Sequence, residues 1–469
     1  MSLLRSLMVG GVAVAIARFL CALLADRRAP ARRIAWVLLL APYFTPVMLT
    51  GYAYANFSLS LIHHPWVNAV FYAALLCWKF TPIAAVILYF APPPISAEAI
   101  HCRRLMDFQR QQSVATTRAY STPDTKFNEW KFLFHAGCAR GPVAAFAVVF
   151  LCAFAEFEMA SLMGVKSWTV TVFDANAGGL AVTESLRRML GPLLCEIAAV
   201  ATTVAVLGRH RLNPVRRSAA GKTTHGIAWL YLSIAFVFVL MIPAGMVLWG
   251  TIRGFGLLFE NFVLTREIVS SLLFTAGATL LASAAILWLS PAPWIRRKGT
   301  MLRRALLLIG VCLGLLGPLV LSLAVLAAVQ LPGLLSLRDT PVPLMLTLAL
   351  VLLPLALVLK RVLELTGYRS ALHLANLMPS SRASQELKWR LNASGKFWAV
   401  VLLFVWVYWD LTASSILAPI GMTPVTVRLY NMMHYGQIAA LSAMTCATFA
   451  VPIFIFLLAF GTRRWWAPR

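Results

Sequence analysis

Charged residues are scarce in this chain, and acidic residues are the scarcest. Only 12% of the 469 residues are Asp, Glu, Lys or Arg, and only 16 are Asp or Glu, whereas 60% are hydrophobic. A typical soluble domain is about 25% charged. The composition therefore excludes a soluble globular protein and predicts an integral membrane protein.

Paired cysteines are also lacking. The eight cysteines stand singly, so neither a disulfide framework nor a zinc site is expected. Gly221-Lys222-Thr223 matches the end of a phosphate-binding loop, but Arg216 stands where that motif needs its first glycine. The N-terminal apolar run has no small-x-small cleavage site, so we expect no cleavable signal peptide. We therefore expect no cofactor, no metal ion, no catalytic residue and no ATPase site within the chain.

Long hydrophobic runs are abundant. A membrane-spanning helix needs about 20 apolar residues, and about eleven segments meet that requirement. They lie near residues 4–25, 34–60, 67–91, 141–163, 189–207, 227–250, 267–290, 305–330, 343–363, 397–417 and 437–460. The sequence thus predicts an all-α polytopic membrane protein with about eleven transmembrane helices.

The net charge of +25 is concentrated between these segments. The basic loops are 26–33, 92–140, 208–225, 294–304 and 361–396. They alternate with loops that are poor in Lys and Arg, and this alternation places the N-terminus outside and the C-terminus in the cytoplasm. Arg18 and the pair Arg187-Arg188 are exceptions to the rule. Attraction to membrane lipid accounts for the basic charge, and nucleic-acid binding is not expected.

The chain also contains an internal repeat. The stretch from Ser6 to Arg33 resembles the stretch from Ser271 to Arg304, and an acid followed by a small-residue motif recurs from Glu156 to Asp410, 410 − 156 = 254 positions on. Helices 1–5 therefore match helices 7–11. One extra crossing, helix 6, makes the two five-helix repeats parallel instead of inverted.

The repeat divides the chain into three parts. We expect a first repeat over residues 1–207 and a second over residues 265–469. Between them, residues 208–264 form a basic linker, helix 6 and an outer loop.

Each repeat has a long basic loop on the predicted cytoplasmic side, at residues 95–140 and 365–396. The first loop contains Glu98-Ala99 and Trp130-Lys131, and the second contains Trp389-Arg390. Two matched loops on one side of the membrane predict two docking points for one kind of partner. The alternative is a pair of solvated loops with no partner.

Three acidic residues, Glu156, Glu158 and Asp410, fall within predicted transmembrane helices. Carboxylates in a membrane are costly and usually face the bundle interior or a water-filled path. Two interpretations stay open. The acids line a translocation path and attract a cation, or they make hydrogen bonds between helices, with Lys79 as a partner.

Prolines interrupt several predicted helices. We expect a break or kink at each of Pro42, Pro46, Pro82 and Pro318. Broken helices near the midplane often border substrate paths, but kinks that only fit neighbouring helices are an equal alternative.

Taken together, these features resemble the fused two-repeat permeases of binding-protein-dependent ATP-binding-cassette (ABC) importers, in the iron(III)-type branch. Ser96-Ala97-Glu98-Ala99-Ile100 stands where the family's cytoplasmic Glu-Ala-Ala loop begins, and Ala155-Glu156-Phe157 matches its later Glu-Phe helix. The stretch from Leu417 to Pro424 looks like the family's outer loop in the second repeat, and Val427-Arg428-Leu429-Tyr430-Asn431 continues it. The loop motifs are degenerate, and the first helix usual in the family is missing.

The resemblance implies the type I ABC importer permease fold, a location in the bacterial cytoplasmic (inner) membrane, and a permease subunit that is not an enzyme. Cytoplasmic ABC ATPase subunits would dock on the two basic loops, and an extracytoplasmic solute-binding protein would deliver a small solute, such as iron(III) or another inorganic ion. The coupling-loop residues would be Glu98, Ala99, Trp130, Lys131, Trp389 and Arg390.

Two other functions stay open. One is an ion-coupled secondary transporter that uses Glu156, Glu158 and Asp410 as proton or cation relays. The other is a degenerate, non-transporting membrane scaffold, because Glu98 has no counterpart in the second loop.

Overall fold

The computed structural model of the chain is helical, and no strand occurs in the residues that it describes. These are residues 1–25, 32–90, 101–102, 105–106, 138–179, 182–207, 223–258, 263–290, 300–366, 374, 377–378, 382–434 and 438–466.

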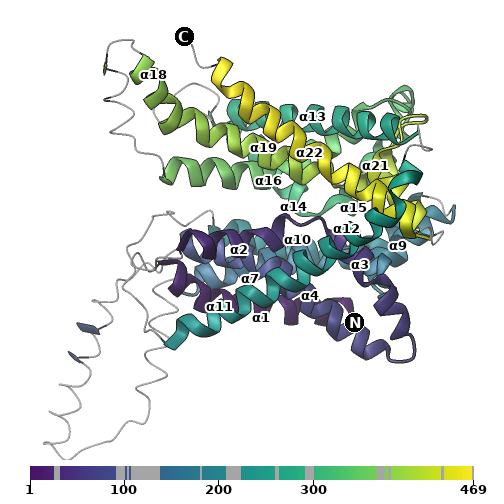
Figure 1. Cartoon of the computed structure of the whole chain (residues 1–469), viewed down its shortest axis with the longest axis horizontal. Helices are drawn as coiled ribbons and strands as arrows, with labels where there is room; N and C mark the ends of the chain where they lie inside the picture. The colour runs from purple at the N-terminus through teal and green to yellow at the C-terminus, as the bar shows by residue number, and fades with distance from the viewer. Residues whose placement is uncertain are drawn as a thin grey trace, which may run out of the picture.

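The helices form an N-terminal half, a connecting crossing and a C-terminal half (Figure 1). The N-terminal half consists of α1 (Ser2–Ala25), α2 (Arg32–Phe44), α3 (Val47–Ser60), α4 (Pro65–Phe90), α7 (Arg140–Phe154), α8 (Glu158–Leu162), α9 (Trp168–Ala177) and α10 (Val182–Leu207). The crossing consists of α11 (Thr223–Phe236), the π-helical turn η1 (Val237–Met241), α12 (Ile242–Gly254) and the short turn η2 (Phe255–Leu258). The C-terminal half consists of α13 (Val263–Leu289), α14 (Thr300–Leu315), α15 (Pro318–Val329), η3 (Leu335–Leu337), α16 (Val342–Thr366), α18 (Arg382–Lys388), η4 (Trp389–Ala393), α19 (Ser394–Tyr408), α20 (Thr412–Leu417), α21 (Val425–His434) and α22 (Ile438–Trp466).

Several of these helices are long and apolar enough to cross a membrane. Seven single spans qualify: Ser2–Ala25, Pro65–Phe90, Thr183–Val206, Gly226–Gly254, Leu264–Leu289, Val342–Glu364 and Ala439–Gly461. Three bent helix pairs raise the number to as many as ten, and the apolar helix α7 is shorter than a span. The prediction of an all-helical, multi-pass membrane protein is confirmed. Helical structure lies on every predicted segment, but the figure of eleven crossings stays a prediction.

Two of the bent pairs lie at predicted prolines. α2 and α3 meet at 73° around Pro46, and α14 and α15 meet at 112° around Gly317 and Pro318. Proline cannot donate the backbone hydrogen bond that continues a helix. Gly317 has φ +84°, and a Cβ at this position would come within 2.8 Å of the Ala155 Cβ, so both the backbone and the packing require glycine there.

The second predicted helix breaks at Pro46 and not at Pro42, and the expected break at Pro82 is wrong, because Pro42 and Pro82 lie inside continuous helices, α2 and α4. A kink at either proline stays a prediction. Beside Pro82, Thr81 Oγ1 donates to the Cys77 carbonyl at 2.6 Å, and Tyr231 donates to Thr81 Oγ1 at 2.8 Å, so a neighbouring helix is bonded to α4 at this point. Threonine side chains and neighbouring helices commonly make a proline tolerable in a membrane helix.

The same packing arrangement occurs in both halves. α1, α4 and α7 pack on one another around one apolar cluster, and α13, α16 and α19 pack on one another around a second. The crossing touches both halves, because α11 packs on α1 and α2, whereas α12 packs on α3 and α22. In Figure 1 the two helix groups lie one above the other, with α12 and α15 near where they meet. A third apolar cluster is shared between the halves and includes Met48, Phe157, Trp409 and Leu429.

Candidate functional site

Glu156 is a buried carboxylate at the break between α7 and α8. Its Oε1 accepts a hydrogen bond from the backbone N–H of Met159 at 2.6 Å, and its Oε2 accepts from the N–H of Ala160 at 3.2 Å and from the Tyr72 hydroxyl. The first N–H groups of a helix have no partner within the helix. Glu156 therefore supplies, inside the protein, the acceptors that α8 would otherwise lack.

A positive charge lies behind this carboxylate. The Arg5 guanidinium on α1 sits over the Tyr72 ring, 4.6 Å from its centroid, and Tyr72 donates to Glu156. Arg5 is also close enough to interact electrostatically with Glu156. Arg5 thus places a positive charge near the buried acid and is held there by its contact with the Tyr72 ring.

Asp410 occupies the equivalent position in the C-terminal half. Its Oδ2 accepts from the backbone N–H groups of Ala413 at 2.9 Å and Ser414 at 3.2 Å, at the start of α20. These donors lie three and four residues beyond the acid, which is the same spacing as in the Glu156 cap. Both acids therefore act as helix caps at breaks that lie 254 residues apart, counted from 156 to 410.

At each of these two breaks, an equivalent threonine donates a hydrogen bond to the backbone carbonyl of the capping acid. Thr169 Oγ1 donates to the backbone carbonyl of Glu156 at 2.8 Å, and Thr426 Oγ1 donates to the backbone carbonyl of Asp410 at 3.0 Å. Each threonine belongs to the helix that follows, α9 or α21. Each break is thus tied to the next helix of its own half.

A serine from the first helix of each half binds the first residue of those helices, although the two serines, Ser2 and Ser271, are not equivalent positions of the repeat. The backbone N–H of Trp168, which begins α9, donates to Ser2 Oγ of α1 at 3.2 Å. The N–H of Val425, which begins α21, donates to Ser271 Oγ of α13 at 2.8 Å. The residue pairs Trp168–Val425 and Thr169–Thr426 each differ by 257 positions, three more than the acids, because the second connection is three residues longer.

Glu158 has a different role from the other two acids, because it joins the halves. Its Oε1 accepts a hydrogen bond from the backbone N–H of Leu411 at 3.0 Å. Lys79 does not pair with these acids. Its Nζ donates instead to the backbone carbonyls of Pro42 and Tyr43, each at 3.4 Å, and to that of Thr45.

These contacts favour helix capping and bonding between halves as the local role of the three acids. That they attract a cation stays a prediction. In the ranges covered by the structure, no group of three or more His, Cys, Asp or Glu side chains is arranged to hold a metal ion.

A cavity of about 610 Å³ lies next to these acids, between the two halves. Its lining residues are Ser161, Gly164, Val165, Lys166, Val170, Phe173, Asp174, Ala177, Ser415, Val427, Tyr430 and Asn431. Four pairs in this set are equivalent positions of the two halves. The pairs are Ser161 with Ser415, Val170 with Val427, Phe173 with Tyr430, and Asp174 with Asn431.

The cavity combines apolar walls with a few polar groups, as small-molecule sites do. Ser161 Oγ and the Tyr430 hydroxyl are 2.7 Å apart and join the halves at its wall. Burial raises the pKa of Tyr430, with the carboxylates of Asp174 and Glu158 adding to the shift and the hydrogen bond to Ser161 opposing it. Tyr430 is therefore a neutral hydroxyl at neutral pH.

Sequence reasoning did not predict this cavity, although the acid motif and the outer-loop stretch that it singled out both contribute lining residues. The repeat itself was the available signal. Adding the Glu156–Asp410 offset of 254 to Ser161 gives Ser415. Beyond that point the connection in the second half is three residues longer, so a constant offset does not align Phe173 with Tyr430.

The predicted coupling residues Glu98, Ala99, Trp130 and Lys131 lie outside the described residues. Trp389 and Arg390 lie in η4, between α18 and α19. Arg390 is exposed and pairs with Glu386 one turn earlier at 2.6 Å, and the Trp389 ring is 6.2 Å from that of Phe397.

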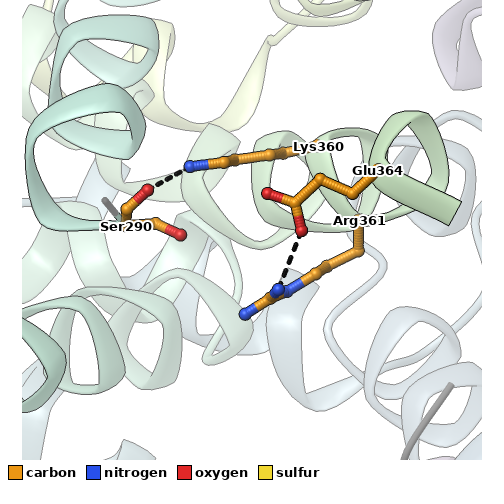
Figure 2. Close-up of polar contacts among 4 residues, drawn as sticks. All are labelled: Ser290, Lys360, Arg361 and Glu364. Atoms are coloured by element: carbon orange, nitrogen blue, oxygen red, sulfur yellow. Dashed lines mark hydrogen bonds and ion pairs between the residues drawn. The ribbon is translucent and has the colours of Figure 1, made fainter. Parts of the chain in front are cut away.

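The other side of the second loop begins at the end of α16. There Arg361 pairs with Glu364 at 2.8 Å, and Lys360 Nζ donates to the backbone carbonyl of Ser290, just beyond α13 (Figure 2). Lys360 thus satisfies a carbonyl at the end of α13 and fixes that end against α16.

In comparisons with known proteins, no family model, no curated protein and no solved structure matches the chain.

Proposed function

We propose that this chain is the transmembrane permease subunit of an ATP-driven ABC importer, which moves a small solute across the bacterial cytoplasmic membrane. The cavity of about 610 Å³ carries the proposal, because equivalent residues of both halves line it. Transporters built from internal repeats commonly place the solute where the repeats meet. In the predicted orientation, the connections that carry Lys166 and Asn431 are on the outer side of the membrane.

The helix packing supports two parallel repeats, residues 1–207 and 265–469. The triad α1–α4–α7 and the triad α13–α16–α19 have the same internal contacts, and each half has a bent pair followed by a capped break. A single crossing, α11 to α12, connects them. One additional crossing between five-helix units gives both the same orientation, so that both long basic loops face one compartment.

This arrangement requires an external source of energy, because the chain has no complete phosphate-binding loop. Cytoplasmic ABC ATPase subunits would dock on loops 95–140 and 365–396, and an extracytoplasmic solute-binding protein would approach the cavity. α16 and α18 flank the second loop, and Lys360 and Arg361 stabilise the end of α16. Membrane lipid would cover the exposed apolar side chains of the long helices.

The test is purification of the tagged protein from its native membrane in mild detergent, followed by identification of bound proteins and an ATPase assay. We expect a cassette ATPase to co-purify, and we expect Glu98→Arg and Arg390→Glu to release it. Arg338→Glu is the matched control, because Arg338 is an exposed arginine between α15 and α16, on the predicted outer side. Release by Arg338→Glu as well would contradict docking on the two basic loops.

The alternatives give different results in the same preparation. If no ATPase co-purifies and proton-driven uptake into vesicles depends on Glu156 or Asp410, the chain is an ion-coupled transporter. If neither activity is found, a scaffold that recruits another protein is the better description.

A further inference from the structure

The cavity between the halves is asymmetric in charge although its framework is paired. The Ser161–Ser415 and Val170–Val427 pairs are identical in both halves. The charged side chains that line it, Lys166 and Asp174, come only from the N-terminal half. The counterpart of Asp174 is the neutral Asn431, so the repeat has diverged where the lining carries charge.

Lys166 and Asp174 are exposed at the cavity and do not neutralise each other. Neither forms an ion pair with another residue in the described part of the chain. A cavity lined by one cation and one anion that are not paired together offers two separate, opposite charges to a ligand. Such a lining gives no net attraction to a singly charged ligand.

The remaining polar groups fit a small organic solute better than a bare ion. The hydroxyls of Ser161, Ser415 and Tyr430 and the Asn431 amide can each donate or accept a hydrogen bond. A metal ion would need several His, Cys or carboxylate ligands together, and the described residues contain no group of three. The apolar walls, including Val170 and Phe173, would contact a short hydrocarbon portion.

We propose that the cavity binds a small zwitterionic solute, with the anionic group of the solute toward Lys166 and its ammonium group toward Asp174. This inference rests on the proposed function, in which the cavity is part of the solute path. It replaces an inorganic ion by a dipolar organic molecule of the size and charge of a small α-amino acid. The uncharged lining residues of the C-terminal half then contribute hydrogen bonds and shape, whereas the charged lining residues of the N-terminal half select the charge of the solute.

The test measures binding to the purified full-length chain in lipid nanodiscs by calorimetry. The probes are L-alanine, L-serine and L-valine, each compared with its amide, which carries only the positive charge, and with its 2-hydroxy-acid analogue, which carries only the negative charge. We expect at least one zwitterion to bind about tenfold more tightly than both of its singly charged analogues. Equal or tighter binding of the singly charged probes, or no zwitterion binding at millimolar concentration, overturns the proposal.

Two substitutions assign the ends of the solute. In Lys166→Gln the amide should bind as well as the amino acid, and in Asp174→Asn the hydroxy acid should bind as well as the amino acid. Arg338→Gln and Asp339→Asn remove the same charges from an exposed connection that does not line the cavity, and we expect no change in selectivity. Unchanged selectivity in both cavity variants would overturn the assignment.

Failure of this inference is distinguishable from failure of the proposed function. Binding is measured without an ATPase. A bound cassette ATPase without zwitterion binding retains the importer and rejects the solute class. Zwitterion binding that depends on Lys166 and Asp174, without any ATPase, retains the solute class and rejects the importer.

Discussion

Glu158 on α8 accepts a hydrogen bond from the backbone N–H of Leu411, 3.0 Å away and 253 residues further along the chain. The acceptor belongs to the N-terminal half and the donor to the C-terminal half. Leu411 directly follows Asp410, which caps α20. The two breaks are therefore linked to each other, and not only capped separately.

Loss of this link should destabilise the protein. In Glu158→Ala the N–H of Leu411, a fully buried residue, loses its acceptor, and leaving a buried donor unsatisfied costs about 1–3 kcal/mol. In Glu158→Gln an amide oxygen can still accept the bond, so we expect a smaller loss. The measurement is the thermal unfolding midpoint in detergent. Glu184→Ala is the control, because Glu184 pairs with Arg188 on an exposed helix surface. Equal midpoints for Glu158→Ala and the control would contradict the link.

Removal of either capping acid, Glu156 or Asp410, should lower the stability of the protein. Asp410→Ala deprives the N–H groups of Ala413 and Ser414 of their acceptor, and loss of a helix cap costs about 0.5–2 kcal/mol. Asp410→Asn keeps an oxygen acceptor and should retain most of this stability. The same unfolding assay measures both variants. If Asp410 only attracts a cation, Asp410→Asn and Asp410→Ala should be equally stable and should differ from the wild type only in transport.

Glu156 should be more sensitive than Asp410, because its carboxylate also accepts a bond from the Tyr72 hydroxyl. We expect Glu156→Ala to lower the unfolding midpoint further than Asp410→Ala. Tyr72→Phe removes only the hydroxyl bond, at about 1 kcal/mol. If Tyr72→Phe has no effect, the bond to Glu156 does not contribute to stability.

Close packing of α12 on α22 depends on glycine. A Cβ on Gly254 would overlap the backbone carbonyl of Ala439, which cannot move aside as a flexible side chain would. Small residues allow such close approach of helices in a membrane. Gly254→Ala should therefore cost about 1–3 kcal/mol, with a lower fraction of monodisperse protein after heating. Gly245→Ala on the same helix is the control, because nothing lies within 4 Å of its added Cβ.

The sequence was sufficient for features that depend on local pattern. The apolar runs predicted where helices occur, and Pro46 and Pro318 predicted two of the breaks, because a missing N–H interrupts the helix at its own position. Pro82 has the same local signal, but it lies inside the continuous helix α4, where Thr81 accepts a hydrogen bond from Tyr231 of the packed helix α11. Tyr231 lies 150 residues away, so no local pattern contains that information.

The hydrogen-bond partners of buried polar groups could not be predicted from the sequence either, because these partners are far apart along the chain. Lys79 was expected near the acids, and its charge does interact with Glu158 and Glu156. Its hydrogen bonds, however, go to carbonyls that the bend between α2 and α3 leaves without donors. Which acceptors are vacant depends on where the helix ends in three dimensions. The cavity likewise depends on how two distant connections meet.

Beyond the three bent pairs, the number of crossings depends on whether α7 is part of a span. Its 15 residues span about 22 Å, which is less than the hydrocarbon core of about 30 Å. The chain completes the crossing only if α8, beyond the Glu156 cap, continues it. With this crossing the cavity residues and the start of α7 lie on opposite sides of the membrane, and without it they lie on the same side.

Cysteine labelling decides between these topologies. In a variant without the other cysteines, Cys138 precedes α7 and should react with a membrane-impermeant maleimide only after permeabilisation, because this end is predicted to be cytoplasmic. Lys166→Cys and Asp174→Cys, in a background without native cysteines, should react with intact cells, because both positions are exposed at the cavity. Labelling of Cys138 and of Lys166→Cys from the same side would make α7 and α8 a re-entrant segment, and the parallel orientation of the two repeats would then be lost.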